Sequence, residues 1–80
     1  MVLPNYEGGS IVNLMSSLGR ALGKSSPYPQ LNQLSSQEIR NYKNVVLFVI
    51  DGLGYDYIKK HGKGTIFGQH LRGKMTTVFP

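Results

Sequence analysis

The amino-acid sequence predicts an α/β fold with a central, mostly parallel sheet, and three consecutive features carry that prediction. Residues 45–50, Val-Val-Leu-Phe-Val-Ile, form an unbroken apolar run, which is typical of a parallel strand covered on both faces. A glycine-containing turn and a helix-like segment, residues 55–60, follow the run and end before Gly62. Residues 74–79 have the composition of a second strand. Strand, turn and helix in this order make the first half of a βαβ unit.

The segment that precedes the apolar run begins with a predicted helix. Ser10 is a suitable N-cap, and apolar residues recur after it with the 3.6-residue period of a helix. Gly23 stands where a C′ glycine would end this helix. We expect the apolar stripe to pack against a neighbouring layer of the protein. Its members are Ile11, Leu14, Met15, Leu18, Ala21 and Leu22.

A loop and a short helix are predicted next. Residues 24–30 contain two prolines, each of which disfavours helix in the residue before it, so this stretch is expected to be a connecting loop. Ser35 or Ser36 can cap a short helix that runs through Arg40, with Glu38 in its first turn, where the helix dipole favours negative charge. Because this helix has few apolar positions, we expect it to be peripheral.

The length of the chain limits what it can bury. Only 16% of its 80 residues are charged, against about 25% in typical soluble domains. A parallel strand needs neighbouring strands and a helical layer on each face, and two candidate strands do not supply them. We therefore expect residues 1–80 to be the N-terminal portion of a single larger domain. In that domain, residues 1–43 would form a helical N-terminal extension and residues 44–80 the start of the α/β core.

Composition excludes several classes of protein. The sequence has no cysteine, so it has neither disulfides nor a cysteine zinc site. Its apolar runs are far shorter than the ~20 residues that cross a bilayer, and its first residues do not resemble a secretory signal. We expect a cytoplasmic protein without a membrane partner.

The formal net charge is +5, but the positive charges are not arranged as in a duplex-binding protein. Four of them stand singly in the sequence: Arg20, Lys24, Arg40 and Lys43. Five others lie closer together: Lys59, Lys60, Lys63, Arg72 and Lys74. A solvated, mildly basic face is therefore favoured over a surface for duplex nucleic acid, and a small anionic substrate is compatible with the charge.

Asp51 is the strongest candidate for a functional residue, because it directly follows the predicted central strand. Ligands of open α/β sheets bind beyond the carboxyl ends of the strands, where the loops converge. Gly52 and Gly54 lack a Cβ atom and would leave room for a metal ion or a phosphate group. On the residues alone two roles stay open for this carboxylate: metal binding or catalysis, and capping of the following helix.

Two other patterns that place glycine or aspartate after a strand are not satisfied. A dinucleotide-binding fold requires Gly-x-Gly-x-x-Gly directly after the strand, whereas here Asp51 intervenes and residue 57 is tyrosine. The haloacid-dehalogenase phosphatases carry a second aspartate two residues after the first, where this chain has Leu53.

Two motifs resemble the type I phosphodiesterase/nucleotide pyrophosphatase family of the alkaline phosphatase superfamily. They are Asn-Val-Val-Leu-Phe-Val-Ile-Asp-Gly-Leu-Gly-Tyr, residues 44–55, and Thr-Thr-Val-Phe-Pro, residues 76–80. Pro-Asn-Tyr, residues 4–6, and Gly-Ser-Ile-Val-Asn-Leu-Met, residues 9–15, also resemble the N-terminal stretch of prokaryotic members. The resemblance implies an alkaline-phosphatase-like α/β/α sandwich.

The same resemblance implies a hydrolase of phosphodiester or nucleotide pyrophosphate bonds with two divalent metal ions, usually Zn²⁺. Its substrate would be a small phosphate ester or a nucleotide. Asp51 matches the first metal-binding aspartate of the family. The family nucleophile is a threonine or serine just beyond the Phe-Pro pair, so it is expected directly after Pro80, and the 80 residues alone are expected to be inactive. Thr76 and Thr77 precede that pair and are assigned to the strand.

Alternative functions stay open beside this one. The superfamily also includes phosphomonoesterases, phosphonate hydrolases, sulfatases and phosphoglycerate mutases, and a non-catalytic binding remnant of the fold is a further class. His61 and His70 match no metal-ligand spacing and are expected to be exposed or locally hydrogen-bonded. Tyr55 and Tyr57 are expected to pack in the first turn of their helix rather than stack on a nucleobase.

Overall fold

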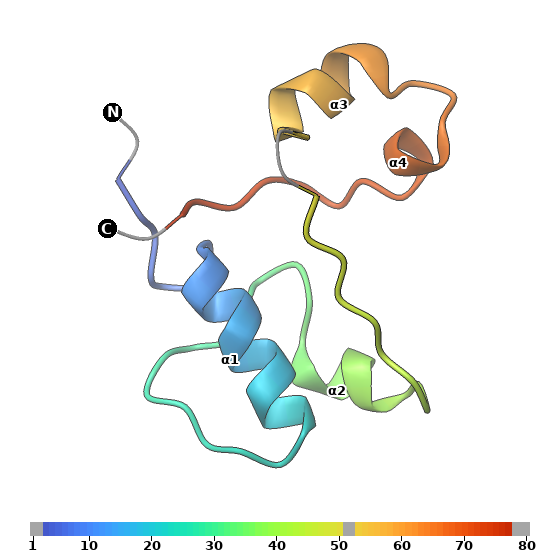
Figure 1. The fold of residues 1–80 in the computed structure, drawn as a ribbon. Helices are drawn as coiled ribbons and strands as arrows, with labels where there is room; N and C mark the ends of the chain where they lie inside the picture. Colours follow the sequence, from blue (N-terminus) through green and yellow to red (C-terminus); the bar gives the residue numbers. More distant parts are fainter. Residues whose placement is uncertain (1–2, 51–52, 78–80) are drawn as a thin grey trace.

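The computed structural model describes residues 3–50 and 53–77. Within these ranges the chain forms four helices: α1 (Ile11–Ala21), α2 (Ser36–Arg40), α3 (Tyr55–His61) and α4 (Ile66–Gln69) (Figure 1). In the same ranges, β-pairing is limited to one isolated parallel bridge, between Ser10 and Thr76. The described part of the chain is therefore partly helical, with almost no strand.

The helices lie in two lobes, and an extended segment crosses between them (Figure 1). The N-terminal lobe, residues 3–43, contains α1 and α2, which pack against each other. The C-terminal lobe, residues 53–71, contains α3 and α4. Residues 72–77 form an extended crossing segment that runs between the two lobes and returns to the start of α1.

Helix α1 begins and ends where the sequence predicts. The N–H of Ser10, the N-cap, donates to Asn13 Oδ1 at 3.0 Å and so ties the first turn to a side chain of the helix. Gly23 has a φ of +88°, the left-handed region that favours glycine. Its N–H donates to the Arg20 carbonyl and that of Lys24 to the Gly19 carbonyl, the two bonds of a Schellman motif.

The prediction of which face α1 buries is met only in part. Leu14, Leu18 and Ala21 of the apolar stripe are half-buried, whereas Met15 is 54% and Leu22 82% exposed. The buried residues of α1 are instead polar: Asn13, Ser16 and Ser17. The physical reason is that the loop beside α1 has backbone groups without a partner in helix or strand, and buried groups of this kind require one. The amide and hydroxyl groups of α1 supply it.

Hydrogen bonds from these polar residues fasten the loop to α1. Asn13 Nδ2 donates to two carbonyl oxygens, and each of the two serine hydroxyls donates to one. The acceptors, all at 2.7–2.8 Å, are the carbonyls of Tyr6, Pro29, Tyr28 and Leu34. Ser17 Oγ also accepts from the Leu31 N–H at 2.8 Å. The stretch predicted as a connection, residues 24–30, thus lies at the surface of the N-terminal lobe and is bonded to α1 through its backbone carbonyls.

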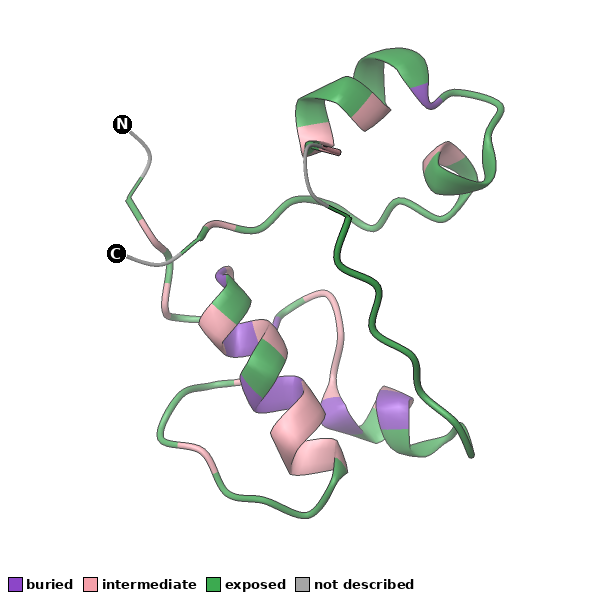
Figure 2. Ribbon diagram, in the orientation of Figure 1, coloured by how far each residue is buried: buried purple, intermediate pink, exposed green. Residues whose placement is uncertain are grey.

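Helix α2 is capped as predicted, since Ser35 Oγ accepts from the Glu38 N–H at 3.1 Å. It is not peripheral, however. Ile39 of α2 and Leu31 of the preceding loop are the buried hydrophobic residues of the described chain (Figure 2). The prediction was wrong because one apolar residue of α2, Ile39, is enough to pack this short helix against the rest of the N-terminal lobe.

The apolar segment, residues 45–50, does not form the covered strand that the sequence predicts. It is extended but has no strand beside it within the described residues, and its side chains are 50–83% exposed. A central strand exists only where neighbouring strands accept its hydrogen bonds, and the described ranges contain none. The α/β sheet therefore stays a prediction.

Helix α3 runs from Tyr55 to His61 with Gly62 as its C-cap, close to the predicted bounds. Helix α4 lies between α3 and the crossing segment, where the sequence shows no helical pattern. It is four residues long, and Thr65 Oγ1 caps it by accepting from the Gly68 N–H at 3.3 Å. So short a helix leaves no periodicity in the sequence. None of the helices in the described ranges has the length and apolarity needed to cross a membrane.

Candidate functional site

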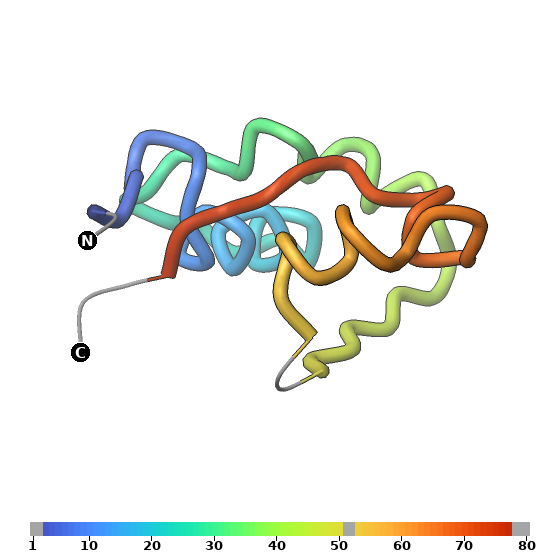
Figure 3. Tube along the Cα trace, turned by 90° about the horizontal axis from the view of Figure 1, so that it is seen from above, coloured from blue at the N-terminus to red at the C-terminus, as the bar shows by residue number. Residues whose placement is uncertain are grey.

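The crossing segment carries the first part of the second resemblance motif and is held to the N-terminal lobe at both ends (Figure 3). At its C-terminal end, the Thr76 N–H donates to the Gly9 carbonyl at 2.7 Å, and the Thr76 carbonyl accepts from the Ile11 N–H at 2.9 Å. These two bonds make the parallel bridge. They set the crossing segment beside the first turn of α1.

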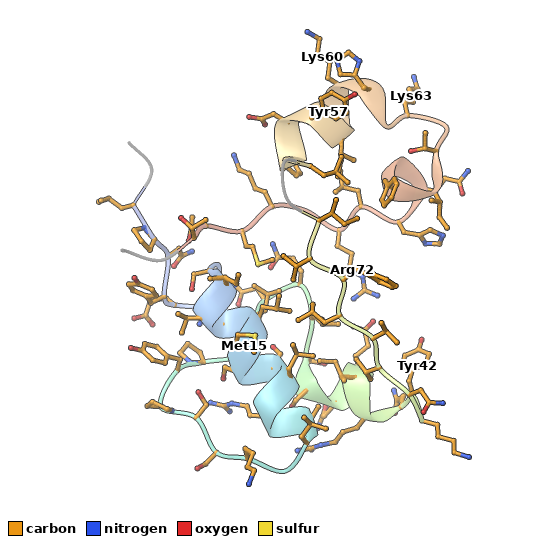
Figure 4. All side chains as sticks on the ribbon, in the orientation of Figure 1. Met15, Tyr42, Tyr57, Lys60, Lys63 and Arg72 are labelled. Carbon is orange, nitrogen blue, oxygen red and sulfur yellow. The ribbon has the colours of Figure 1, made fainter. Side chains whose placement is uncertain are left out.

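At its other end, Arg72 points from the crossing segment toward the N-terminal lobe (Figure 4). It forms a two-pronged ion pair with Glu38, in which Nη1 lies 2.8 Å from Oε1, and it also donates to the Gln33 carbonyl at 3.0 Å. The hydrogen bond from Arg72, followed by the attraction of its charge, lowers the pKa of the Glu38 carboxyl. Gln33 Nε2 adds a bond to the Lys74 carbonyl at 3.1 Å.

A central groove of about 530 Å³ lies where these elements meet. It takes residues from the N-terminal lobe, from the first turn of α3 and from the crossing segment. The lining residues are Asn5, Gly9, Asn32, Gln33, Tyr55, Asp56, Lys74, Met75, Thr76 and Thr77. Both resemblance motifs therefore contribute to one groove, because Tyr55 ends the first motif and Thr76 begins the second.

Tyr55 lies between two lysines at the edge of this groove. The Lys74 Nζ atom is 5.8 Å from the centre of its ring and the Lys59 Nζ atom 6.0 Å, the range of a cation–π interaction. Tyr57 contacts His61 instead, with ring centres 4.8 Å apart. The pairing of Tyr55 with Lys74 was not predicted. The spacing of the two residues in the sequence does not reveal it, because tertiary contacts of the crossing segment place Lys74 beside Tyr55.

The hydroxyl of Thr76 is committed to the backbone. It accepts from the Asn5 N–H at 2.7 Å and donates to the Gly9 carbonyl at 3.3 Å. Thr77 is exposed and lines the groove. The structure thus gives Thr76 a structural role at the bridge.

The predicted metal ligand, Asp51, lies outside the described residues, as do Gly52 and Pro80. Within the described ranges no three histidine, aspartate or glutamate residues converge to hold a metal ion. His61 and His70 are both exposed. Lys60 and Lys63 point away from the crossing segment (Figure 4).

Comparison with known proteins adds no relative. A scan against protein-family models, a search of curated proteins and a search of solved structures each found no significant match. The resemblance to the phosphodiesterase family therefore stays a prediction that rests on the residues of the two motifs.

Proposed function

We propose that this chain contributes to a metal-dependent hydrolase of phosphodiester or nucleotide pyrophosphate bonds with an alkaline-phosphatase-like α/β/α sandwich. One observation carries the proposal: the central groove is lined by residues of both resemblance motifs. Tyr55 stands four residues after Asp51, and Thr77 stands three residues before Pro80. The proposal assigns metal binding to Asp51 and expects a hydroxyl nucleophile directly after Pro80.

Two lysines lie near the Tyr55 ring at the edge of the groove; Lys74 lines the groove and Lys59 lies outside its lining, which also includes the carboxylate of Asp56. Lys74 and Lys59 place two positive charges beside Tyr55. Positive charge along a groove raises the local concentration of phosphate esters and speeds their encounter. The exposed hydroxyl of Thr77 adds a hydrogen-bond donor. In the proposal, two divalent metal ions, Zn²⁺ in the first instance, would stabilise the attacking and leaving oxygens, with Asp51 as one ligand.

The test is substitution of Asp51 in protein that continues past Pro80, since the proposal places the nucleophile there. Asp51→Ala should lose bound metal and reduce hydrolysis of bis-p-nitrophenyl phosphate by more than about 100-fold, because a carboxylate ligand is removed. Metal content is measured by elemental analysis and hydrolysis by release of nitrophenolate.

Asp56→Ala is the matched control, because Asp56 carries the same charge in the first turn of α3 and lines the same groove. It should keep metal and activity. Unchanged metal content in Asp51→Ala, or an equal loss in both variants, would contradict the proposal. Assays with p-nitrophenyl phosphate and p-nitrophenyl sulfate distinguish the other activities of the superfamily, and no hydrolysis of any of them would favour a binding remnant.

A further inference from the structure

Three cations that stand apart in the sequence line a second groove, here called the basic groove. Arg20, Lys24 and Arg40 border about 480 Å³ of space where the C-terminal ends of α1 and α2 meet. Three serines complete its polar lining: Ser25, Ser26 and Ser36. No carboxylate lines the basic groove among the described residues, and it shares no lining residue with the central groove.

The backbone fixes the positions of these cations. The Schellman turn at Gly23 reverses the chain after α1 and sets Lys24 beside the last turn of that helix. Arg20 is held by bonds from Nε to Ser16 Oγ at 3.2 Å and from Nη2 to the Tyr28 carbonyl at 2.8 Å. Arg40 Nη2 donates to the backbone carbonyl of Arg20 and so bridges the two helices.

These bonds leave most of the donors of the groove unused. A guanidinium group has five N–H donors and an ammonium group three. The bonds of Arg20 use Nε and Nη2, so Nη1 has no acceptor within the described ranges, and the bond of Arg40 uses Nη2 alone. Lys24 Nζ has no acceptor there either. The basic groove therefore presents three positive charges and several free N–H groups without a neutralising carboxylate.

Ser36 adds a hydroxyl donor to the lining of the basic groove. Its side chain lines the basic groove, yet the residue is only 7% exposed, and its hydroxyl has no hydrogen-bond partner in the described part of the chain. Its backbone N–H is already satisfied by Gln30 Oε1 at 2.8 Å. This hydroxyl is not a buried unsatisfied group, so it is a donor still available to a ligand in the groove.

We infer that the basic groove binds a small, free phosphate-bearing anion. Arginine and lysine donors around one space match the several acceptor oxygens of a phosphate group, and charge-assisted bonds of this kind are the strong ones. The groove volume admits a pyrophosphate-sized ligand, whose negative charges the three cations would balance. This inference does not rest on the proposed hydrolase, since it uses none of the residues of the central groove.

Inorganic pyrophosphate is the probe, and its binding is followed by calorimetry and by NMR shifts of the chain. Lys24→Gln and Arg40→Gln should each weaken binding about tenfold, the loss expected when one charge-assisted bond is removed. Lys43→Gln and Lys63→Gln remove exposed charges outside the groove and should change affinity by less than about twofold. NMR shifts on binding should centre on Arg20, Lys24 and Ser36.

Arg40 also supports the backbone of α1, so Arg40→Lys, which keeps the charge, and circular dichroism separate loss of binding from loss of fold. Lys24→Gln removes a side chain without a partner in the described ranges and tests binding alone. Wild-type affinity in the Lys24→Gln and Arg40→Gln variants, or equal weakening in the two controls, would overturn the assignment. So would tighter binding to vesicles of phosphatidylcholine with a phosphoinositide than to pyrophosphate, because a lipid headgroup would then be the ligand.

Discussion

The N-terminal lobe and the rest of the described chain are stabilised in different ways (Figure 2). The N-terminal lobe has a polar interior, in which Asn13 and Ser17 are fully buried and bonded to the backbone of a loop. In the C-terminal lobe neither α3 nor α4 buries a residue, and the apolar segment is exposed along its length. One region is held by specific hydrogen bonds, and the other consists of local helices and an uncovered apolar run.

The difference lies in which buried or apolar groups find partners within the described residues. Buried amide and hydroxyl groups are costly unless each finds a partner, and those of α1 find theirs within the lobe. Exposed apolar side chains instead lack the burial that would stabilise them, because the hydrophobic effect acts only on surface that is removed from water. We therefore expect the apolar segment to gain stability from further protein, as the proposed sandwich requires.

The sharpest test of this comparison is a substitution in the apolar segment, and it has the largest expected effect. Phe48 is 80% exposed in the described structure, so Phe48→Ala in the 80 residues should change the free energy of unfolding by less than about 0.5 kcal/mol. In protein that continues past Pro80, the sandwich would cover this strand, and the same substitution should cost about 3–5 kcal/mol. Urea denaturation of both lengths measures the difference.

Tyr42→Ala is the control for Phe48, because Tyr42 is an exposed aromatic residue that precedes the predicted strand. It should have a small effect at both lengths. An equally small effect of Phe48→Ala in the longer protein would show that the strand is not covered there, and the sandwich would lose its main support.

A second substitution tests the polar interior of the N-terminal lobe. Asn13→Ala removes the groups that bond Ser10, Tyr6 and Pro29, and it should destabilise the lobe by about 2–3 kcal/mol because buried backbone groups lose their partners. Amide hydrogen exchange of α1 measures the change. Gln37→Ala, which removes an exposed amide on α2, should leave the protection unchanged. Retained protection of α1 in Asn13→Ala would show that apolar contacts, rather than this amide, hold the lobe.

What the sequence predicted correctly was local. Ser10, Gly23 and the pair Ser35 and Ser36 were recognised as helix boundaries because capping depends on the few residues around it. The burial of Asn13 was missed because its partners, such as Pro29, belong to a loop whose course periodicity does not reveal. The prediction that the apolar stripe of α1 is covered failed at its exposed residues for the same reason. A periodic pattern identifies an apolar face, but it does not show which segment covers that face.

The grooves were beyond prediction for a related reason. Arg20 and Arg40 are far apart in the sequence, and they line one groove only because α1 and α2 pack together. Lys74 reaches Tyr55 only because the crossing segment is fastened at Thr76. Asp51 was predicted to be a metal ligand because it follows the predicted strand and matches a family motif. Measuring bound metal in Asp51→Ala tests that role.

The smallest expected effect concerns the ion pair that fastens the crossing segment to the N-terminal lobe. The hydrogen bond from Arg72 lowers the pKa of Glu38 in the folded chain below its unfolded value. The contribution of this pair to stability is therefore fully present above the unfolded pKa and is lost as the pH falls through the folded pKa. Both side chains are exposed, so the contribution is that of a surface pair, which is screened by salt.

An NMR titration of the Glu38 carboxyl tests this link between charge and the crossing segment. Arg72→Gln should bring the pKa of Glu38 back toward its ordinary value, because the donor that stabilises the carboxylate is gone. Amide protons of the crossing segment should then exchange faster at neutral pH. Their protection should also no longer fall when Glu38 is protonated at low pH. If Glu38 titrates alike with and without Arg72, the two side chains do not pair in solution, and the crossing segment is held by its other bonds, those of Thr76 and those with Gln33.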